Sequence, residues 1–323
     1  MEHTFPLLQL PENAIIIVLE NLRLGQLFEL SLLSSKCKNL VVSLSLRVRV
    51  AYITISRKIS LIVYTDTSVL VLHFYNNLND QNVALPADIT LPADAFLSLE
   101  KQIIQSTTFN FSDWLNYIRT VFCFKKPPSV YFREGCERFE VQYLKEAIGN
   151  VDVLYVANEV TGVYNKEVLK RFIAPNSMSL GRNLFDETCE VQKFFIQNFE
   201  RVEFNDVYSL DDMLLLNSEK VKFYRPTTQK QINQFLHHWI RGSNRRLQRM
   251  SLSIGDTDLV RREVLLKGIN FVDVAEEEQL EICRNHGIDS NNLVQIRRKD
   301  GTPAVIAVNE RRPFLNVHFV VLY

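Results

Sequence analysis

Three pairs of side chains have the residue types that catalysis or metal binding would need. His237 and His238 are adjacent, but neighbours on a helix point about 100° apart and could not easily hold one metal ion. Asp211 and Asp212 could act as paired acids, yet they follow Ser209 at a predicted helix start, where carboxylates stabilise the helix dipole. We interpret both of these pairs as structural.

Cys283 and His286 have the spacing of a thiol nucleophile and its base on one helix. Gly287 indicates that this helix ends there, and no third group orients the histidine. The sequence also lacks the short motifs of serine hydrolases, zinc proteases, phosphate-binding loops and dinucleotide-binding folds. We therefore predict that the protein is not an enzyme and that it needs no cofactor and no metal ion.

The charge balance and the cysteines restrict the partners and the compartment. Lys plus Arg and Asp plus Glu both number 37, so no global attraction to nucleic acid or to an anionic membrane is expected. The cysteines are odd in number and never spaced as C-x-x-C, which argues against disulfides and zinc and favours reduced thiols in the cytoplasm or nucleus. They are Cys37, Cys123, Cys136, Cys189 and Cys283.

A basic cluster follows a predicted helix in the stretch "RGSNRRLQRM". Its members, Arg241, Arg245, Arg246 and Arg249, could contact phosphates or an acidic peptide. Basic residues near a helix C-terminus also complement the helix dipole, and this second interpretation is the one we favour.

These residues must be positioned by secondary structure, and the sequence changes character along its length. Three short helices are expected before residue 47, with a break near Ser34 and Ser35. A meander of three strands follows, with turns at 57–58 and 66–68. Residues 76–96 are expected to form an exposed connection. Helices resume after Ser112, a candidate N-cap, and in a segment that Gly149 closes.

Beyond Gly149, short apolar strands alternate with helices at intervals of about 20 to 30 residues, a period typical of leucine-rich-repeat-like units. This order predicts a parallel sheet covered by helices. Asp300-Gly301 then predicts a hairpin, and a third strand follows it. The expected fold is α/β: a small helical N-terminal domain, then a leucine-rich-repeat-like strand and helix domain with antiparallel strands near both ends.

An apolar run, Phe5 to Leu22, opens the chain. Glu2 and Glu12 are acidic and Pro11 interrupts the run, so it fits neither a signal peptide nor a membrane span. A helix that begins at Pro11 would carry an apolar stripe formed by Ile15, Val18, Leu19 and Leu22. This stripe could pack into the protein's own core or dock onto a partner, and periodicity alone favours the core.

The N-terminal pattern resembles the F-box, in particular that of the nematode-expanded F-box proteins, although Leu24 stands where many members have Pro and Cys37 where many have Trp. The resemblance rests on Leu10-Pro11-Glu12, Val18-Leu19, Leu22, Leu27, Leu30-Ser31, Leu33, Lys36 and Leu40. Four later stretches, "SLDDMLLLNSEKVKF", "INQFLHHWIRGSNRRLQRMSL", "LLKGI" and "QIRRKDGTPAVIAV", are similar to the F-box-associated domain of type 2. The domains are expected at 1–47 and 48–323.

The resemblance implies a substrate-recruiting adaptor of an SCF-type cullin-RING ubiquitin ligase, with a Skp-type linker protein and, through it, a cullin as partners. A leucine-rich-repeat-like interaction scaffold without a ubiquitin-ligase role is the alternative. The expected linker-binding residues are Leu10, Pro11, Ile15, Val18, Leu19, Leu22, Leu27, Leu30 and Leu33. On the face of the sheet that helices leave open, Tyr155, Glu203 and Tyr224 are the candidates for binding an unknown protein substrate.

Overall fold

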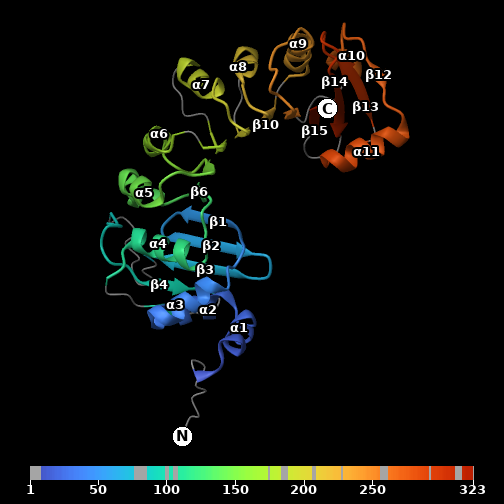
Figure 1. Cartoon of the computed structure of the whole chain (residues 1–323). Helices are drawn as coiled ribbons and strands as arrows, with labels where there is room; N and C mark the ends of the chain where they lie inside the picture. The colour runs from blue at the N-terminus through green and yellow to red at the C-terminus, as the bar shows by residue number, and fades with distance from the viewer. Residues whose placement is uncertain are drawn as a thin grey trace. The chain divides into compact units, whose positions relative to one another are not determined.

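The computed structural model describes residues 9–75, 86–98, 102–104, 108–173, 175–182, 188–205, 209–226, 228–254, 261–290, 292–309 and 315–322. The chain divides into two compact units, Met1–Ile173 and Ala174–Tyr323 (Figure 1). We call them unit 1 and unit 2. The boundary predicted near residue 47 falls inside unit 1, and as a domain boundary it stays a prediction.

Unit 1 begins with the three expected helices, α1 (Glu12–Glu20), α2 (Leu24–Leu33) and α3 (Ser35–Ser43). Pro11 precedes α1, where a residue without a backbone N–H costs no hydrogen bond. Ser34 separates α2 from α3, and its side-chain oxygen accepts a hydrogen bond of 3.2 Å from the Cys37 amide. A side-chain cap therefore places the break at Ser34, where the sequence predicts it.

The sheet of unit 1 has the strand order β5-β4-β3-β2-β1-β6-β7. The expected meander is confirmed in β1 (Val48–Ile55), β2 (Ile59–Thr65) and β3 (Val69–Phe74), which pair antiparallel. Two short strands, β4 (Ala95–Leu97) and β5 (Gln102–Ile104), extend the meander on the β3 side. On the other side β6 (Ser129–Phe132) and β7 (Val153–Val156) are added in parallel.

The expectation that residues 76–96 form an exposed connection holds only in part. Residues 76–85 lie outside the described residues. In the remainder, Ile89 and Ala93 are buried and β4 begins at Ala95, so the expectation is wrong there. The indole N–H of Trp114 donates a 2.7 Å hydrogen bond to the Ala93 carbonyl, which ties this segment to the core despite its polar composition.

The later helices of unit 1 are α4 (Phe111–Val121), α5 (Val141–Ile148) and α6 (Gly162–Arg171). Ser112 is not the N-cap of α4, because the side chains of Asn110 and Asp113 form a reciprocal capping box that starts the helix at Phe111. Gly149 closes α5 as predicted, with a positive φ of 78° that favours glycine.

Unit 2 has the strand order β8-β9-β10-β11-β15-β14-β13-β12. Its first four strands run parallel: β8 (Ser177–Leu180), β9 (Arg201–Phe204), β10 (Lys220–Pro226) and β11 (Arg249–Ile254). The helices that follow β8, β9 and β10 are α7 (Thr188–Phe195), α8 (Leu210–Leu215) and α9 (Gln229–Ile240). Alternation of strand and helix is therefore as predicted, whereas the leucine-rich-repeat resemblance stays a prediction.

The end of unit 2 is antiparallel. The hairpin of β13 (Leu293–Arg297) and β14 (Pro303–Asn309) turns at Asp300-Gly301, and β15 (Leu315–Val321) returns to pair with β11. This confirms the hairpin and the third strand. The remaining elements are α10 (Arg262–Leu265), β12 (Val272–Asp273) and α11 (Glu276–His286).

Alternation along the strands of unit 2 separates two faces of the sheet. Val202, Phe204, Val221 and Phe223 are buried on one face, and Phe195 of α7 contacts Phe204 edge-on at 5.0 Å between ring centroids. Figure 1 shows α7, α8 and α9 along this side and α11 on the other. α11 packs at β13, β14 and β15, and none of the helices in the described residues packs on the second face of β9 and β10.

Candidate functional site

Three surfaces carry the residues that the sequence singles out. The first is formed by the N-terminal helices, which are apolar on more than one side. Ile15, Leu19 and Leu27 are buried in unit 1, so their side chains serve its core in this structure. The other predicted linker-binding residues are accessible to some degree: Pro11, Val18 and Leu33 are exposed, and Leu10, Leu22 and Leu30 are half-buried.

The most exposed apolar side chains of these helices are Ile17 of α1, with 61% of its surface accessible, and Leu33 of α2, with 75%. The sequence predicts a role for Leu33 but not for Ile17, which lies off the stripe formed by Ile15 and Leu19. We call Ile17, Val18 and Leu33 the outer helix surface. The apolar atoms of these three side chains meet solvent in this structure and are accessible to a partner.

The inner side of the same helices is fixed to the rest of unit 1. Phe28 of α2 is fully buried and its ring lies 6.1 Å from Trp114, 6.3 Å from Tyr117 and 6.5 Å from Phe122. The Tyr117 hydroxyl donates a 2.7 Å hydrogen bond to the buried Ser31 carbonyl. The helices therefore have an anchored inner side and a free outer side.

The second surface is a row of four tyrosines on the sheet of unit 1. Tyr64, Tyr52, Tyr131 and Tyr155 come from β2, β1, β6 and β7, and successive ring centroids lie 5.7, 5.7 and 5.5 Å apart. Tyr155, predicted to bind substrate, is half-buried at the end of this tyrosine row, with the Arg133 guanidinium 5.9 Å from its ring. A continuous aromatic row is suited to packing against apolar or proline-containing segments of another protein.

The third surface lies on the uncovered face of unit 2 and brings the other two predicted substrate-binding residues together. The Tyr224 hydroxyl, on β10, donates a 2.9 Å hydrogen bond to the Glu203 carboxylate on β9. Arg201 forms an ion pair with the same carboxylate. Tyr224 is 40% exposed and Lys222 lies over its ring at 4.2 Å. The Glu203 carboxylate therefore already bonds two neighbouring side chains of this surface.

Cations dominate the same face, in a row that crosses three strands. Strand register places Arg201 opposite Lys220 and Lys220 opposite Arg249, and Lys222 follows on β10. We call Arg201, Lys220, Lys222 and Arg249 the basic face. Like charges directly opposite one another on neighbouring strands destabilise a sheet, so the row is maintained at a cost to stability.

The basic face is concave and partly neutralised. Its four cations line a pocket of about 220 Å³ together with Val221, Ser251 and His318. Glu203 pairs with Arg201, and Glu200 lies 3.2 Å from the Lys220 ammonium. Among the described residues, neither Lys222 nor Arg249 contacts a carboxylate.

Two titratable groups report the positive potential of this pocket. Burial, and then the nearby charge of Arg201, lowers the pKa of the Arg249 guanidinium. Burial, and then the charges of Arg249 and Lys222, lowers the pKa of His318 to about 4. His318 is therefore neutral at pH 7, and its Nδ1 lies 2.9 Å from the Ser251 hydroxyl oxygen.

The position of Arg249 corrects the interpretation of the basic cluster. We expected this arginine to complement the dipole of the preceding helix, but α9 ends at Ile240 and Arg249 begins β11. Its guanidinium Nη1 instead donates a 2.6 Å hydrogen bond to the carbonyl of His286, the last residue of α11. Alternation of cations with buried apolar residues in "RVEF", "KVKF" and "RMSL" is the sequence signal that would have indicated a basic sheet face.

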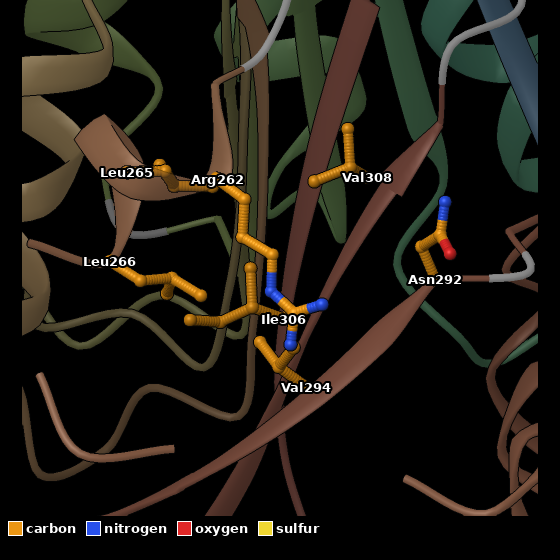
Figure 2. A pocket seen from close by; sticks show the side chains of 7 residues that line it. All are labelled: Arg262, Leu265, Leu266, Asn292, Val294, Ile306 and Val308. Atoms are coloured by element: carbon orange, nitrogen blue, oxygen red, sulfur yellow. The ribbon is translucent and has the colours of Figure 1, made fainter. Parts of the chain in front are cut away.

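A further pocket, of about 170 Å³, lies between α10 and the hairpin of unit 2. Figure 2 shows Arg262 reaching across it toward Ile306 and Val294, with Leu265 and Leu266 from α10 beside them. Arg262 is already engaged, because it pairs with Asp273 and its guanidinium lies 4.7 Å from the Phe271 ring. The remaining lining is mostly apolar and holds no group for acid-base chemistry.

The residue pairs first considered for chemistry have structural partners. Asp212 and Ser209 form a capping box at the start of α8, as predicted. His237 Nε2 lies 3.0 Å from the Lys267 carbonyl, and the Cys283 thiol donates to the Ser290 carbonyl at 3.2 Å. In the described part of the chain, no group of three or more His, Cys, Asp or Glu could hold a metal ion. None of the helices in the described ranges is both long and apolar enough to cross a bilayer.

Comparison with protein families identifies two regions of the chain. Residues 7–49 match the F-box domain family, and residues 190–252 match the F-box associated family. The chain thus carries an F-box domain followed by an F-box-associated domain, which confirms the resemblance to these two domains. The assignment to the nematode-expanded branch stays a prediction. Such domains are typical of adaptor proteins, and F-box domains bind Skp-type linkers within SCF complexes. Comparisons with curated proteins and with solved structures give no match.

Proposed function

We propose that the protein is a substrate-recruiting adaptor of an SCF-type cullin-RING ubiquitin ligase. In this role the F-box docks on a Skp-type linker, and the remainder of the chain presents a protein substrate to catalytic subunits that transfer ubiquitin by proximity. The observation that carries the proposal is the F-box match over residues 7–49, on helices whose outer side is apolar and exposed.

The outer helix surface is the part that we assign to the linker. Ile17 and Leu33 are exposed enough to be buried by a partner without repacking unit 1, whereas Ile15 and Leu19 would have to leave its core. Apolar area buried at such a contact contributes about 25 cal/mol per Å², so two exposed aliphatic side chains supply a substantial part of a specific interface.

Co-purification with a Skp-type linker tests this assignment. The double variant Ile17→Asp/Leu33→Asp is expected to lose the linker, because two charges would have to be buried without partners. Val163→Asp, a change at a still more exposed apolar residue on α6, is the control and should retain the linker. Retention of the linker by the double variant would exclude the outer helix surface as the contact.

Replacement of Leu10 and Pro11 by alanine addresses the F-box motif itself. Leu10 is half-buried and Pro11 is exposed at the start of α1, so this change removes apolar contact area and the residue that sets the entry to the helix. Loss of linker binding in a folded variant is expected. Unchanged binding would count against the adaptor function.

The alternative is an interaction scaffold without a ligase role, and the anchored inner side of α2 favours it to the extent that the helices complete the core of unit 1. A full-length protein that binds a protein partner but no Skp-type linker would support this alternative. We retain Tyr155, Glu203 and Tyr224 as proposed substrate contacts in either case.

A further inference from the structure

We propose that the tyrosine row of unit 1 binds a proline-rich segment of a partner protein in the polyproline II conformation, with an acidic residue of that segment beside Arg133. This inference rests on the proposed function, because it names a chemical class for the segment by which an adaptor would recruit its substrate. The row combines inclined aromatic rings, hydroxyl donors and a cation at one end.

The row lies on the face of the unit 1 sheet that is opposite to its helices. On the covered face, the ring of Phe132 on β6 lies 5.5 Å from that of Phe172 at the end of α6. Tyr131 precedes Phe132 on the same strand, so alternation turns its side chain to the other face. There Tyr64 keeps 39% of its surface accessible, and the other three rings of the row are half-buried. A partner can therefore reach the row without repacking the core.

The rings of the row are inclined to one another. The interplanar angles between successive rings are 82°, 60° and 38° from the Tyr64 end to the Tyr155 end. The row is therefore not one flat platform, and each inclined pair presents a ring face to a group that lies beside the neighbouring ring. Proline side chains are compact, apolar and rigid, and proline-rich segments dock on aromatic surfaces of other proteins in this way.

The spacing of the rings is compatible with the repeat of a polyproline II helix. This helix has three residues per turn and rises about 3.1 Å per residue, so residues i and i+3 lie about 9 Å apart on one side. Two ring steps of 5.5 to 5.7 Å span at most about 11 Å, and less where the row bends with the twist of the sheet. Two prolines spaced as P-x-x-P can therefore lie against alternate rings of the row.

The hydroxyl groups favour polyproline II over a helix as the bound conformation. A polyproline II segment has no internal hydrogen bonds, so its carbonyl oxygens stay available as acceptors, whereas a helix satisfies its own carbonyls. The hydroxyls of Tyr52, Tyr64 and Tyr155 donate to no protein group within the described residues. Phenolic hydroxyls are donors, so the row can offer rings to the prolines and hydrogen bonds to the carbonyls between them.

The two ends of the row differ in charge. At one end the guanidinium of the exposed Arg133 lies 5.9 Å from the Tyr155 ring, and no carboxylate in the described part of the chain pairs with it. At the other end Asp66, two residues after Tyr64, already forms an ion pair with Arg49. A carboxylate of the bound segment is therefore favoured beside Arg133, which sets the direction and register of the segment on the row.

The test uses the full-length protein and arrays of short peptides of degenerate sequence with two fixed prolines spaced as P-x-x-P. Matched arrays carry alanine at both positions, and further arrays add a fixed glutamate or lysine beside the prolines. We expect at least about tenfold higher retention on proline than on alanine arrays, a preference for glutamate over lysine, and competition by a proline decapeptide. Equal retention on the alanine arrays, or stronger retention of amphipathic helical peptides or of soluble oligosaccharides, would overturn the proposal.

Variants locate the binding. Tyr64→Ala removes an exposed ring without opening the core and should reduce retention about tenfold, whereas Tyr143→Ala on α5 is the matched control, because Tyr143 is also 39% exposed. Tyr52→Phe removes only a hydroxyl and should reduce retention about threefold. Arg133→Gln should abolish the preference for glutamate, and Arg284→Gln, at an exposed arginine of α11, should keep it. Normal retention by folded Tyr64→Ala protein would refute the assignment.

The oligomeric state distinguishes a partner protein from a second copy of this chain. We expect sedimentation of the full-length protein to give the same mass for the original chain and for Tyr64→Ala. A dimer that Tyr64→Ala dissociates, together with no retention on the proline arrays, would assign the row to contact between copies and overturn the proposal.

Linker co-purification, performed on the same variants, separates this inference from the proposed function. Tyr64→Ala should still capture the Skp-type linker, because the outer helix surface is unchanged. A protein that captures the linker but no proline-rich peptide refutes the inference alone. A protein that captures proline-rich peptides but no linker refutes the adaptor function and leaves the peptide site supported.

Discussion

The tyrosine row of unit 1 and the basic face of unit 2 lie on sheets that are built alike and yet present different chemistry. In both units parallel strands alternate buried apolar residues with residues on the opposite face. On β6 and β7 the latter include Tyr131 and Tyr155, whereas on β9 and β10 they include Arg201 and Lys220. The alternation of buried apolar residues is enough to form the sheet in both units. The residues between them face the other side, so their side chains can differ in the contacts that they make.

The comparison has a consequence for energetics. Aromatic packing depends on buried area and changes little with salt, whereas a cluster of cations attracts its ligand through a field that salt screens. Contacts at the tyrosine row should therefore change little with ionic strength, while contacts of an anionic group at the basic face should weaken as salt is added.

The largest effect is expected from a change that separates the stability of the two units. Phe28→Ala removes a fully buried ring that contacts Trp114, Tyr117 and Phe122, and should lower the free energy of unfolding of unit 1 by about 3–5 kcal/mol. Hydrogen exchange should show lost protection in β1–β3 and unchanged protection in β9–β11. Leu33→Ala, an exposed change on the same helix, is the control. Equal loss in both units would mean that they unfold as one body.

The next largest effect is expected from salt, which should weaken binding at the basic face more than binding at the tyrosine row. Raising NaCl from about 0.05 M to about 0.5 M shortens the Debye length from roughly 14 Å to roughly 4 Å, so binding of an acidic peptide at the basic face should fall about tenfold or more. Binding measured by fluorescence anisotropy at several salt concentrations gives the slope. A salt-independent affinity would show that contacts other than charge dominate at this face.

A smaller effect is expected at the tyrosine row. Tyr155→Ala should weaken substrate capture by about 1–3 kcal/mol if Tyr155 is an anchor, without changing the salt dependence or the linker binding. Tyr224→Ala is the companion change at the edge of the basic face and should weaken capture by a similar amount while the salt dependence remains. If folded Tyr155→Ala protein captures substrate normally, the tyrosine row is not part of the binding surface.

The smallest effect concerns two histidines that occupy equivalent settings. His73 lies 2.8 Å from the Ser60 hydroxyl across β2 and β3, and His318 lies 2.9 Å from the Ser251 hydroxyl across β11 and β15. Burial, and then the charge of Lys58, lowers the pKa of His73 below its usual value, just as the pKa of His318 is lowered to about 4.

Because each folded-state pKa lies below the unfolded value near 6.5, the unfolded chain binds more protons than the folded chain as the pH falls below 6.5, and for His318 this difference extends to about pH 4. The stability that the folded chain gains by keeping these histidines neutral is fully present above about pH 6.5 and is lost as the pH falls toward 4. Denaturant unfolding at pH 7 and pH 5 should therefore show a smaller loss for His318→Gln than for the original chain. An identical loss would mean that His318 is not buried as described.

The sequence predicted the elements whose signals are local. Asp300-Gly301 is a dipeptide typical of a hairpin turn, and the hairpin forms there. Ser34 can cap a helix with its own side chain, and α3 begins after it. In contrast, β4 and β6 are as short as β8 and β9 or shorter, and they lie outside the regular strand and helix order that made β8 and β9 recognisable. Periodicity also could not separate the two sides of α1, because its apolar residues occupy both.

The candidate sites show the same limit. Glu203 and Tyr224 were selected for their residue types, and the structure joins them by a hydrogen bond. The basic face was missed because its members come from three strands, and only the pairing of residues 201, 220 and 249 reveals that their charges share one row. Register between distant segments is a property of the folded sheet, and no single stretch of sequence contains it.

The packing of α2 on α4 has a consequence for protein engineering. A chimera that exchanges the first 47 residues as a cassette would remove Phe28 from its contacts with Trp114 and Phe122, and the uncovered rings would be expected to drive aggregation. A chimera joined after Ile173 keeps these contacts and exchanges the basic face as a whole. Under the proposed adaptor function, such a chimera would exchange the substrate-presenting unit, while the F-box helices stay with the sheet that supports them.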